Sequence, residues 1–264
     1  MRLEDLKYSS MTLNLGKIIR TGNLLADDGK ALVVALDHGM IGITRGIEHM
    51  GRVIDQVMKG GADGVLITLG AAKRLALKLS GKISIVLSIP FDPKYVELAA
   101  KIGADAVKTM YFGKVPLEWD QMGKISEVAE TAEDWGMIYM VEVVPVDESG
   151  KIIYDLEKIK QAARIGSELG GDIVKTAYVG PPSSYRKEVV DSCLAPIMIM
   201  GGPRMETARE TLAIVKEAMD AGAVGGVIGR NIWQHTNPEK MTHVISAIIH
   251  ENMEVDEALK ILEE

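Results

Sequence analysis

Apolar residues gather along the chain in short runs, and most of these runs are separated by stretches with helical spacing. In segments 47–58 and 206–219 the apolar positions recur about every 3.6 residues, which predicts amphipathic helices. The short runs show no polar alternation, a pattern typical of parallel strands that are buried on both faces. Eight strands are therefore predicted, near residues 31–36, 63–68, 83–89, 105–110, 137–144, 171–176, 196–200 and 223–228.

Four of these runs open in the same way, which indicates an internal repeat. Segments 61–68, 103–111, 170–178 and 222–228 each begin with glycine and a small residue and continue with β-branched residues. A glycine in that place is typical of the residue that ends a helix. The repeated unit is thus a helix that leads into a buried strand.

Eight such units predict an α/β protein with a single (β/α)8 TIM barrel, whose usual length of about 250 residues is close to the 264 residues of this chain. An open doubly wound sheet is the alternative, but no Gly-x-Gly-x-x-Gly follows the first strand. We expect one domain over residues 1–264. Residues 1–29 form an N-terminal helical extension that plugs the N-terminal face of the barrel or packs on a neighbouring subunit, and residues 238–264 form C-terminal helices with a break near 252–255.

Composition narrows the possible partners. The net charge of −7 argues against nucleic acid or an anionic membrane, since both favour a basic surface. One cysteine, Cys193, permits neither an intramolecular disulfide nor a thiolate metal cage. The histidines lack ligand-like spacing with carboxylates, so we expect neither metal nor cofactor. The acidic start of the chain does not resemble a signal peptide and no apolar run approaches 18 residues, which predicts a cytoplasmic protein.

Two lysines occupy equivalent places in the repeat. Lys108 and Lys175 each lie within an apolar strand, where an ammonium group needs a partner or loses its proton. A neutral amine is a nucleophile toward carbonyl groups, so the pattern indicates Schiff-base chemistry. Strands four and six contribute to the same interior layer of a barrel, which predicts that the lysines lie near each other, with Glu142 of strand five between them.

The carboxyl ends of the strands carry further candidates. Asp37 and His38 follow the first strand, and we expect His38 to have a packing role. The last two strands end in glycine turns, and Arg230 adds a cation suited to bidentate contacts. Barrels commonly bind phosphate after these two strands. The substrate is therefore expected to be a small phosphorylated carbonyl compound.

Four ordered motifs closely resemble the archaeal-type class I aldolases: Ala35-Leu36-Asp37-His38-Gly39, Ile173-Val174-Lys175-Thr176, Gly201-Gly202-Pro203 and Gly229-Arg230-Asn231-Ile232-Trp233-Gln234. That group includes fructose-bisphosphate aldolase, 2-amino-3,7-dideoxy-heptulosonate synthase and the autoinducer-2 thiolase. The resemblance implies a TIM barrel, a Schiff base at Lys175 and an acid/base role for Asp37. It also implies phosphate binding by Gly201, Gly202, Gly229 and Arg230, and a homo-oligomer, often a decamer.

One departure from these aldolases concerns the proton donor. The aldolase and synthase members carry a catalytic tyrosine before the proline that ends strand five, and this chain has Val144 there. Glu142, two residues earlier, is expected to take over proton transfer. Tyr111 and Tyr178 are less favoured candidates to replace the catalytic tyrosine as proton donor. The thiolase branch also lacks the tyrosine.

The sequence therefore predicts a metal-independent class I aldolase that cleaves a phosphorylated ketose through Lys175, with Asp37, Glu142 and Lys108 assisting. Other hypotheses remain open. Transaldolases carry their nucleophile on strand four, which would make Lys108 the Schiff-base lysine. An acyl transferase or a transaldol-type synthase could use Lys175 as its nucleophile. The two lysines and Glu142 could instead form an ion-pair cluster with a purely structural role. The barrel could also bind phosphosugars without catalysing a reaction.

Overall fold

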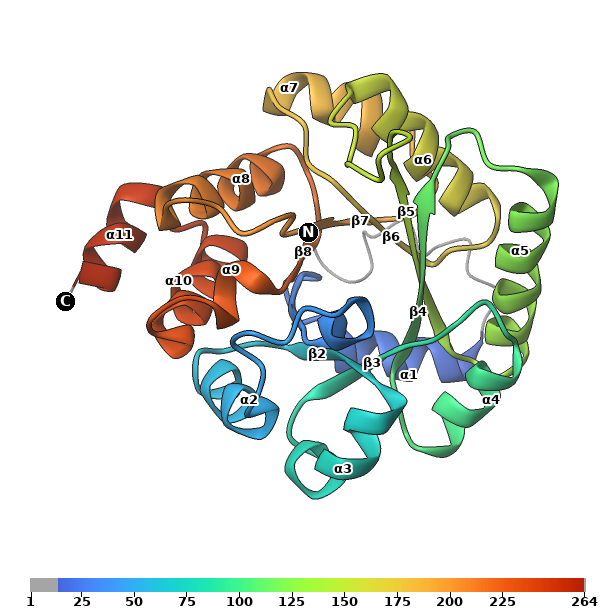
Figure 1. Ribbon diagram of the computed structural model, residues 1–264, viewed down its shortest axis with the longest axis horizontal. Coiled ribbons are helices and arrows are strands. Elements are labelled where there is room, and N and C mark those ends of the chain that lie inside the picture. Colours follow the sequence, from blue (N-terminus) through green and yellow to red (C-terminus); the bar gives the residue numbers. More distant parts are fainter. Residues whose placement is uncertain (1–13, 264) are drawn as a thin grey trace.

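Eight parallel strands pair in sequence order and close into a barrel in the computed structural model, which describes residues 14–263 (Figure 1). The predicted TIM barrel is thus confirmed, and every predicted strand is present. The largest difference is at the fourth strand, which continues to Gly113. The strands are β1 (Ala31–Ala35), β2 (Gly64–Thr68), β3 (Ser84–Ser88), β4 (Ala106–Gly113), β5 (Ile138–Pro145), β6 (Ile173–Thr176), β7 (Ile197–Met200) and β8 (Gly225–Ile228).

Helices surround the barrel in Figure 1, as the alternating pattern predicts. They are α1 (Leu15–Leu24), η3 (Asp37–Ile41), α2 (Met50–Lys59), α3 (Leu69–Leu79), α4 (Lys94–Lys101), α5 (Trp119–Asp134), α6 (Leu156–Glu168), α7 (Pro182–Tyr185), η4 (Arg186–Val190), α8 (Ala208–Asp220), α9 (Arg230–Trp233), α10 (Pro238–Glu251) and α11 (Val255–Glu263). The predicted helices at 47–58 and 206–219 correspond to α2 and α8. The predicted break after the first C-terminal helix is also present, because Asn252, directly after α10, has a left-handed conformation with φ of 59°.

The barrel closes where β8 pairs with β1, and this closure requires a glycine. Gly225 is in register with Ala31 and has a φ of 143°, which L side chains rarely adopt. A Cβ at Gly225 would lie 1.9 Å from the carbonyl oxygen of Ala31. The small-residue opening of the last repeat therefore has a direct steric reason.

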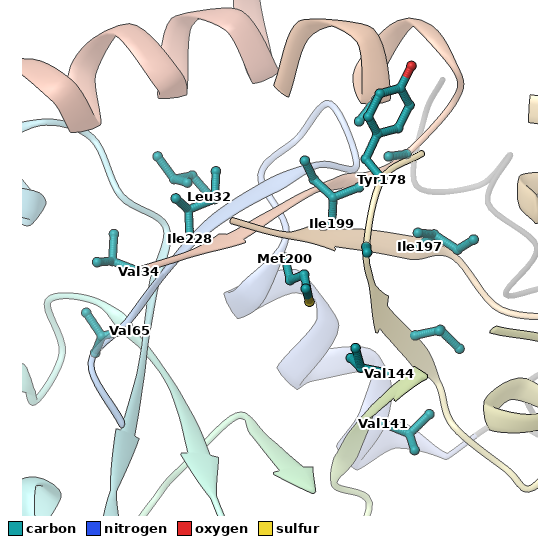
Figure 2. Close-up of a cluster of buried hydrophobic side chains, with 14 of the residues drawn as sticks. Leu32, Val34, Val65, Val141, Val144, Tyr178, Ile197, Ile199, Met200 and Ile228 are labelled. Carbon is teal, nitrogen blue, oxygen red and sulfur yellow. The ribbon is translucent and has the colours of Figure 1, made fainter. Parts of the chain in front are cut away.

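Apolar side chains alternate between the inside and the outside of the barrel. Val33 and Met140 belong to the interior cluster, whereas Leu32 and Val141 belong to the larger cluster between strands and helices. Figure 2 shows part of this outer cluster around β1, β7 and β8. Because both faces are buried, the strand sequences contain apolar residues without alternation, as predicted.

Helix α1 packs against the N-terminal end of the barrel. Leu24 of α1 belongs to the interior cluster, and Lys17 forms an ion pair of 2.8 Å with Asp172 at the start of β6. Arg20 donates hydrogen bonds to the carbonyl oxygens of Gly136 and Ala104, which precede β5 and β4. Helix α1 thus covers this face of the barrel, which agrees with the predicted plug at the N-terminal face. Positions 1–13 of the extension lie outside the described residues.

Candidate active site

A cavity of about 110 Å³ opens at the carboxyl ends of the strands. All eight residues predicted for the site line it, and they come from β4, β5, β6 and the segments that follow β1, β7 and β8. The lining residues are Ala35, Asp37, His38, Met40, Ile41, Lys108, Met110, Phe112, Glu142, Ile152, Lys175, Met200, Gly201, Gly202, Val227, Gly229 and Arg230.

The four charged residues predicted for catalysis form one continuous chain of ion pairs. Asp37 Oδ2 lies 3.0 Å from Lys108 Nζ, and Lys108 Nζ lies 3.0 Å from Glu142 Oε2. The other oxygen of Glu142, Oε1, lies 2.7 Å from Lys175 Nζ. Glu142 thus lies between the two lysines, as the repeat predicts, and binds each of them through a different carboxylate oxygen.

Both carboxylates are held in the charged state. Burial raises the pKa of Glu142, but the ammonium groups of Lys108 and Lys175 outweigh burial and place that pKa below its ordinary value. Burial likewise raises the pKa of Asp37, yet the two lysines and a hydrogen bond from Ser88 lower it to about 2. Ser88 is a buried residue of β3 that sequence reasoning missed.

The two lysines differ in their electrostatic surroundings. Burial lowers the pKa of Lys108, but Glu142 and Asp37 together raise it above its ordinary value. Burial also lowers the pKa of Lys175. There Glu142 is the main opposing group, and the neighbouring Lys108 lowers the pKa further, so the net pKa of Lys175 lies below its ordinary value. Of the two amines, Lys175 is the one whose proton is easier to remove.

Backbone at the ends of β7 and β8 lines the cavity where the sequence predicts phosphate binding. Gly202 has a φ of 65°, and within residues 14–263 the amides of Gly202 and Gly229 are not used in any hydrogen bond. Gly201 differs, because its amide donates to the carbonyl of Val227 at 3.4 Å. A Cβ at Gly229 would lie 2.6 Å from His38 Cε1, and one at Gly201 would lie 2.8 Å from Ile228 Cγ2. Packing therefore also favours glycine at positions 201 and 229.

Arg230 is placed to bind an anion at this end of the cavity. Its Nη2 donates to the carbonyl oxygen of Gly202 at 3.1 Å, while its Nε is buried without a hydrogen-bond partner. Burial lowers the pKa of Arg230, yet a guanidinium remains charged at neutral pH. A buried donor without a partner is unfavourable, and an anionic oxygen would satisfy it.

Two further residues support this end of the cavity, and sequence reasoning missed both roles. The Asn231 side chain donates to the carbonyls of Gly201 and Pro203 and accepts from the amide of Met205. Asn231 thus ties the segment after β7 to the end of β8, and its place beside Arg230 was the only signal in the sequence. The Tyr154 hydroxyl lies 3.3 Å from the place that a Cβ of Gly202 would take. Nothing in the sequence pattern indicates that position.

Val144, which takes the place of the family tyrosine, does not line the cavity, and neither do Tyr111 and Tyr178. Val144 is fully buried in the larger apolar cluster. The Tyr111 hydroxyl donates to the carbonyl of Lys114, and the Tyr178 hydroxyl donates to Glu217 of α8. Figure 2 shows the ring of Tyr178 pointing away from the barrel centre. Among the three proposed replacements, only Glu142 lies in the cavity.

His38 lines the cavity beside Asp37 as a neutral imidazole. Burial lowers its pKa to about 4, even though Asp37 opposes this shift. Its ring packs against the edge of Trp233, with centroids 5.3 Å apart. The Nδ1 atom lies 3.6 Å from Asp37 Oδ1, is buried, and has no hydrogen-bond partner. The packing role expected for His38 agrees with these contacts.

The described residues give no indication of a metal site or a membrane span. Over residues 14–263, no group of three or more His, Cys, Asp or Glu side chains is arranged to hold a metal ion. No helix in the same range is both long and apolar enough to cross a membrane.

Comparison with known proteins places these observations in a family. The sequence model described as DeoC/LacD family aldolase matches residues 26–235. An uncharacterized aldolase of Saccharolobus solfataricus is 34% identical, over 94% of this chain and 99% of its own length. The 2-amino-3,7-dideoxy-D-threo-hept-6-ulosonate synthase 1 of Archaeoglobus fulgidus is 31% identical, over 93% of this chain and 95% of its own length.

Solved structures support the same architecture. A Schiff base forming fructose-1,6-bisphosphate aldolase superposes with a TM-score of 0.75 at 24% identity, over 90% of this chain and all of that chain. At this level of identity the similarity shows the fold, and the family follows from the sequence matches.

Proposed function

Because the chain belongs to the DeoC/LacD family of aldolases, we propose that it is a Schiff-base-forming class I aldolase that acts on a phosphorylated ketose. Lys175 is the nucleophile in this proposal, Glu142 and Asp37 transfer protons, and Lys108 is a positioning residue. The phosphate is bound by Gly202, Gly229 and Arg230, with Gly201 shaping the turn.

The observation that carries the proposal is the asymmetry between the two lysines. Lys108 is 1% exposed and lies between two carboxylates, which is what a structural ion-pair member requires. Both lysines line the cavity, but Lys175 has a single carboxylate partner and a lowered pKa. A neutral amine in contact with a cavity can attack a carbonyl carbon. This asymmetry favours Lys175 over Lys108 as the nucleophile, and it argues against a purely structural cluster.

Formation of the Schiff base begins with a proton transfer across the shortest ion pair. Lys175 Nζ gives a proton to Glu142 Oε1 at 2.7 Å and becomes a free amine. The amine forms a bond to the ketone carbon, and a proton moves from its nitrogen to the carbonyl oxygen to give a carbinolamine. Asp37, beside Lys108, shuttles the proton held by Glu142 to the hydroxyl, which leaves as water. The iminium then forms, and Glu142 is again a carboxylate.

Carbon–carbon cleavage then uses the iminium as the electron acceptor. Glu142 removes the proton of the hydroxyl group on the carbon beyond the bond that breaks. The electron pair of that bond moves into the iminium, giving an enamine, while the oxygen forms the carbonyl of a released aldehyde. Protonation of the enamine and hydrolysis restore Lys175. The positive nitrogen stabilises the developing carbanion, so the chemistry proposed here involves no metal.

Borohydride trapping tests the proposal. Reduction in the presence of dihydroxyacetone phosphate converts an iminium into a stable secondary amine, and peptide mass mapping locates it. We expect one adduct on Lys175, and none in the Lys175→Met variant. An adduct on Lys108 would move the nucleophile to β4. No adduct with dihydroxyacetone phosphate or with ketose phosphates would contradict the proposal and favour a barrel that only binds phosphosugars.

A synthase is the second candidate, because relatives of that kind match nearly the whole chain. The 2-amino-3,7-dideoxy-hept-6-ulosonate synthases of Archaeoglobus fulgidus and Halobacterium salinarum are 31% and 33% identical. The same lysine would then transfer the enamine to an acceptor aldehyde and form a bond. Product analysis separates the two candidates: a lyase releases free aldehyde, whereas a synthase turns over only when a second carbonyl compound is added. An acetyl thioester formed with coenzyme A would instead indicate the acyl transferase.

We also propose that the protein is a homo-oligomer. Helix α1 has an apolar stripe on its exposed side, where Leu15, Ile18 and Ile19 are 53% to 68% exposed. Such a stripe at helical spacing is suited to a second copy of the chain. Light scattering on the full chain measures the mass, and replacing Ile18 and Ile19 by Glu is expected to lower it. A monomeric wild-type protein would contradict this proposal.

A further inference from the structure

The wall of the cavity is polar and cationic on one side of the barrel and mainly apolar on the opposite side. Gly202 and Arg230 follow β7 and β8, and they form the side that is suited to an anion. Because the eight strands close in sequence order, β4 lies across the barrel from β8. A substrate whose phosphate lies at Arg230 therefore extends toward β4 and the end of β5.

The β4 wall runs from a charged floor to an apolar rim. Lys108, Met110 and Phe112 occupy alternate positions of the strand, so their side chains line the cavity one above another. Lys108 at the floor is 1% exposed, whereas Phe112 at the rim is 43% exposed. Ile152, after β5, also lines the cavity. The side opposite Arg230 thus presents thioether, phenyl and aliphatic surfaces.

The charges of the lining residues are already largely matched. Their cations are Lys108, Lys175 and Arg230. Lys108 is paired with two carboxylates and Lys175 with one, which leaves Arg230 as the only lining cation without a carboxylate partner among the described residues. Lys114 continues the β4 row beyond Phe112, but its side chain is exposed and is not part of the cavity wall.

We propose that the substrate carries a single phosphate, bound at Arg230, and that the half of the substrate along β4 is uncharged. This inference rests on the proposed aldolase function and names its substrate class. A second phosphate would lie against Met110, Phe112 and Ile152 and would lose water without gaining a cation. An aldehyde half without phosphate instead packs its carbon chain on these side chains.

The test compares ketoses that differ only in their phosphates. The wild-type full chain is incubated with fructose 1-phosphate, fructose 6-phosphate or fructose 1,6-bisphosphate, and both aldehyde release and borohydride-trapped adduct on Lys175 are measured. We expect kcat/KM for one of the monophosphates to exceed that for the bisphosphate by about tenfold or more, because a buried unpaired charge is strongly unfavourable. A bisphosphate that is used as well as, or better than, both monophosphates would overturn the inference.

Variants of the β4 wall make the test specific. Phe112→Arg places a cation where the second phosphate would lie, and it is expected to shift the preference toward the bisphosphate by about tenfold relative to the Phe112→Gln control. Lys114→Ala is expected to leave the preference of the wild type unchanged. A selective loss of bisphosphate activity in Lys114→Ala would show that Lys114 binds a second phosphate and would overturn the inference.

The outcomes also separate this inference from the function on which it rests. If Lys175 is trapped with the bisphosphate more readily than with either monophosphate, the aldolase proposal stands and the single-phosphate inference fails. If Lys175 is trapped with none of the three sugars and not with dihydroxyacetone phosphate, both fail together.

Discussion

Glu142 and Lys175 are direct cross-strand partners on β5 and β6, and their charged atoms are 2.7 Å apart. The two residues are in register, so the backbone pairing of the barrel itself holds the carboxylate against the amine. Glu142 is 3% exposed and Lys175 is 6% exposed, which keeps bulk water from screening the pair. Proton transfer between these two atoms is the first step of the proposed reaction, and the fold fixes its geometry before any substrate binds.

Replacing Glu142 by Gln is expected to separate Schiff-base formation from turnover. The amide keeps the size of the side chain but cannot accept the proton that leaves the substrate hydroxyl. We expect kcat to fall by about 10² to 10⁴, the usual contribution of a general base. Borohydride should still trap an adduct on Lys175, because the Glu142 carboxylate raises the pKa of Lys175 and its loss favours the free amine without Glu142 as proton acceptor. Glu142→Asp, which retains a carboxylate, is the matched control. Unchanged kcat in Glu142→Gln would remove Glu142 from the proposed mechanism.

Replacing Lys108 by Met is expected to shift the pH dependence of adduct formation to higher pH. Lys108 lowers the pKa of Lys175, so the pKa of Lys175 rises when that positive charge is lost. The neutral amine then forms only at higher pH, and the rising limb of the trapping rate moves in the alkaline direction. The free energy of unfolding should also fall, by about 3 to 5 kcal/mol, because Asp37 loses its ion-pair partner in the interior. A Lys108→Met protein whose trapping rate keeps the wild-type pH profile would contradict the electrostatic role.

Replacing Arg230 by Gln is expected to weaken the binding of phosphorylated substrates. Loss of a charge-assisted contact should raise KM by about tenfold to hundredfold, with a smaller effect on kcat. Arg204→Gln is the matched control, because Arg204 lies in the segment after β7 but is exposed and does not line the cavity. Equal effects of the two substitutions would indicate a general electrostatic attraction in place of a phosphate site at Arg230.

Stability should depend on pH through His250, at the end of α10. Its Nδ1 and Nε2 lie 3.1 Å from Asp28 and Asp63, so both nitrogens donate only when the ring is protonated. The hydrogen bond to Asp63 raises the pKa of His250, and burial opposes this only in part. The stabilisation is complete below about pH 6.5, the ordinary pKa of histidine, and is lost as pH rises through the higher pKa of the folded state.

Urea unfolding of the wild type and His250→Gln at acidic and alkaline pH measures this effect. The free energy of unfolding should differ between the two proteins by on the order of 1 kcal/mol at pH 6, and the difference should shrink as the pH rises above the pKa of His250 in the folded protein. Asp28→Asn should reduce the difference, since it removes one of the two acceptors. A difference that is constant with pH would mean that the ring stays neutral.

The sequence alone determined the barrel and the residues that meet in its cavity. Runs that are apolar on both faces are characteristic of parallel strands, and the repeat gave Lys108 and Lys175 the same orientation on strands four and six. The same interior-layer argument placed Glu142 of strand five between the two lysines. These are local properties of the chain, so they can be inferred before the strands are assembled.

Only the tertiary structure decided how the two lysines differ and which supporting residues reach the site. The number of carboxylates beside each amine depends on strand register and barrel closure, which join Asp37 to Lys108 and leave Lys175 with Glu142 alone. By sequence position, Tyr111 and Tyr178 were candidates for the proton donor, but their hydroxyls donate hydrogen bonds to groups outside the cavity. Distances between groups on different strands and loops are set by packing in three dimensions, and the order of residues along the chain does not contain them.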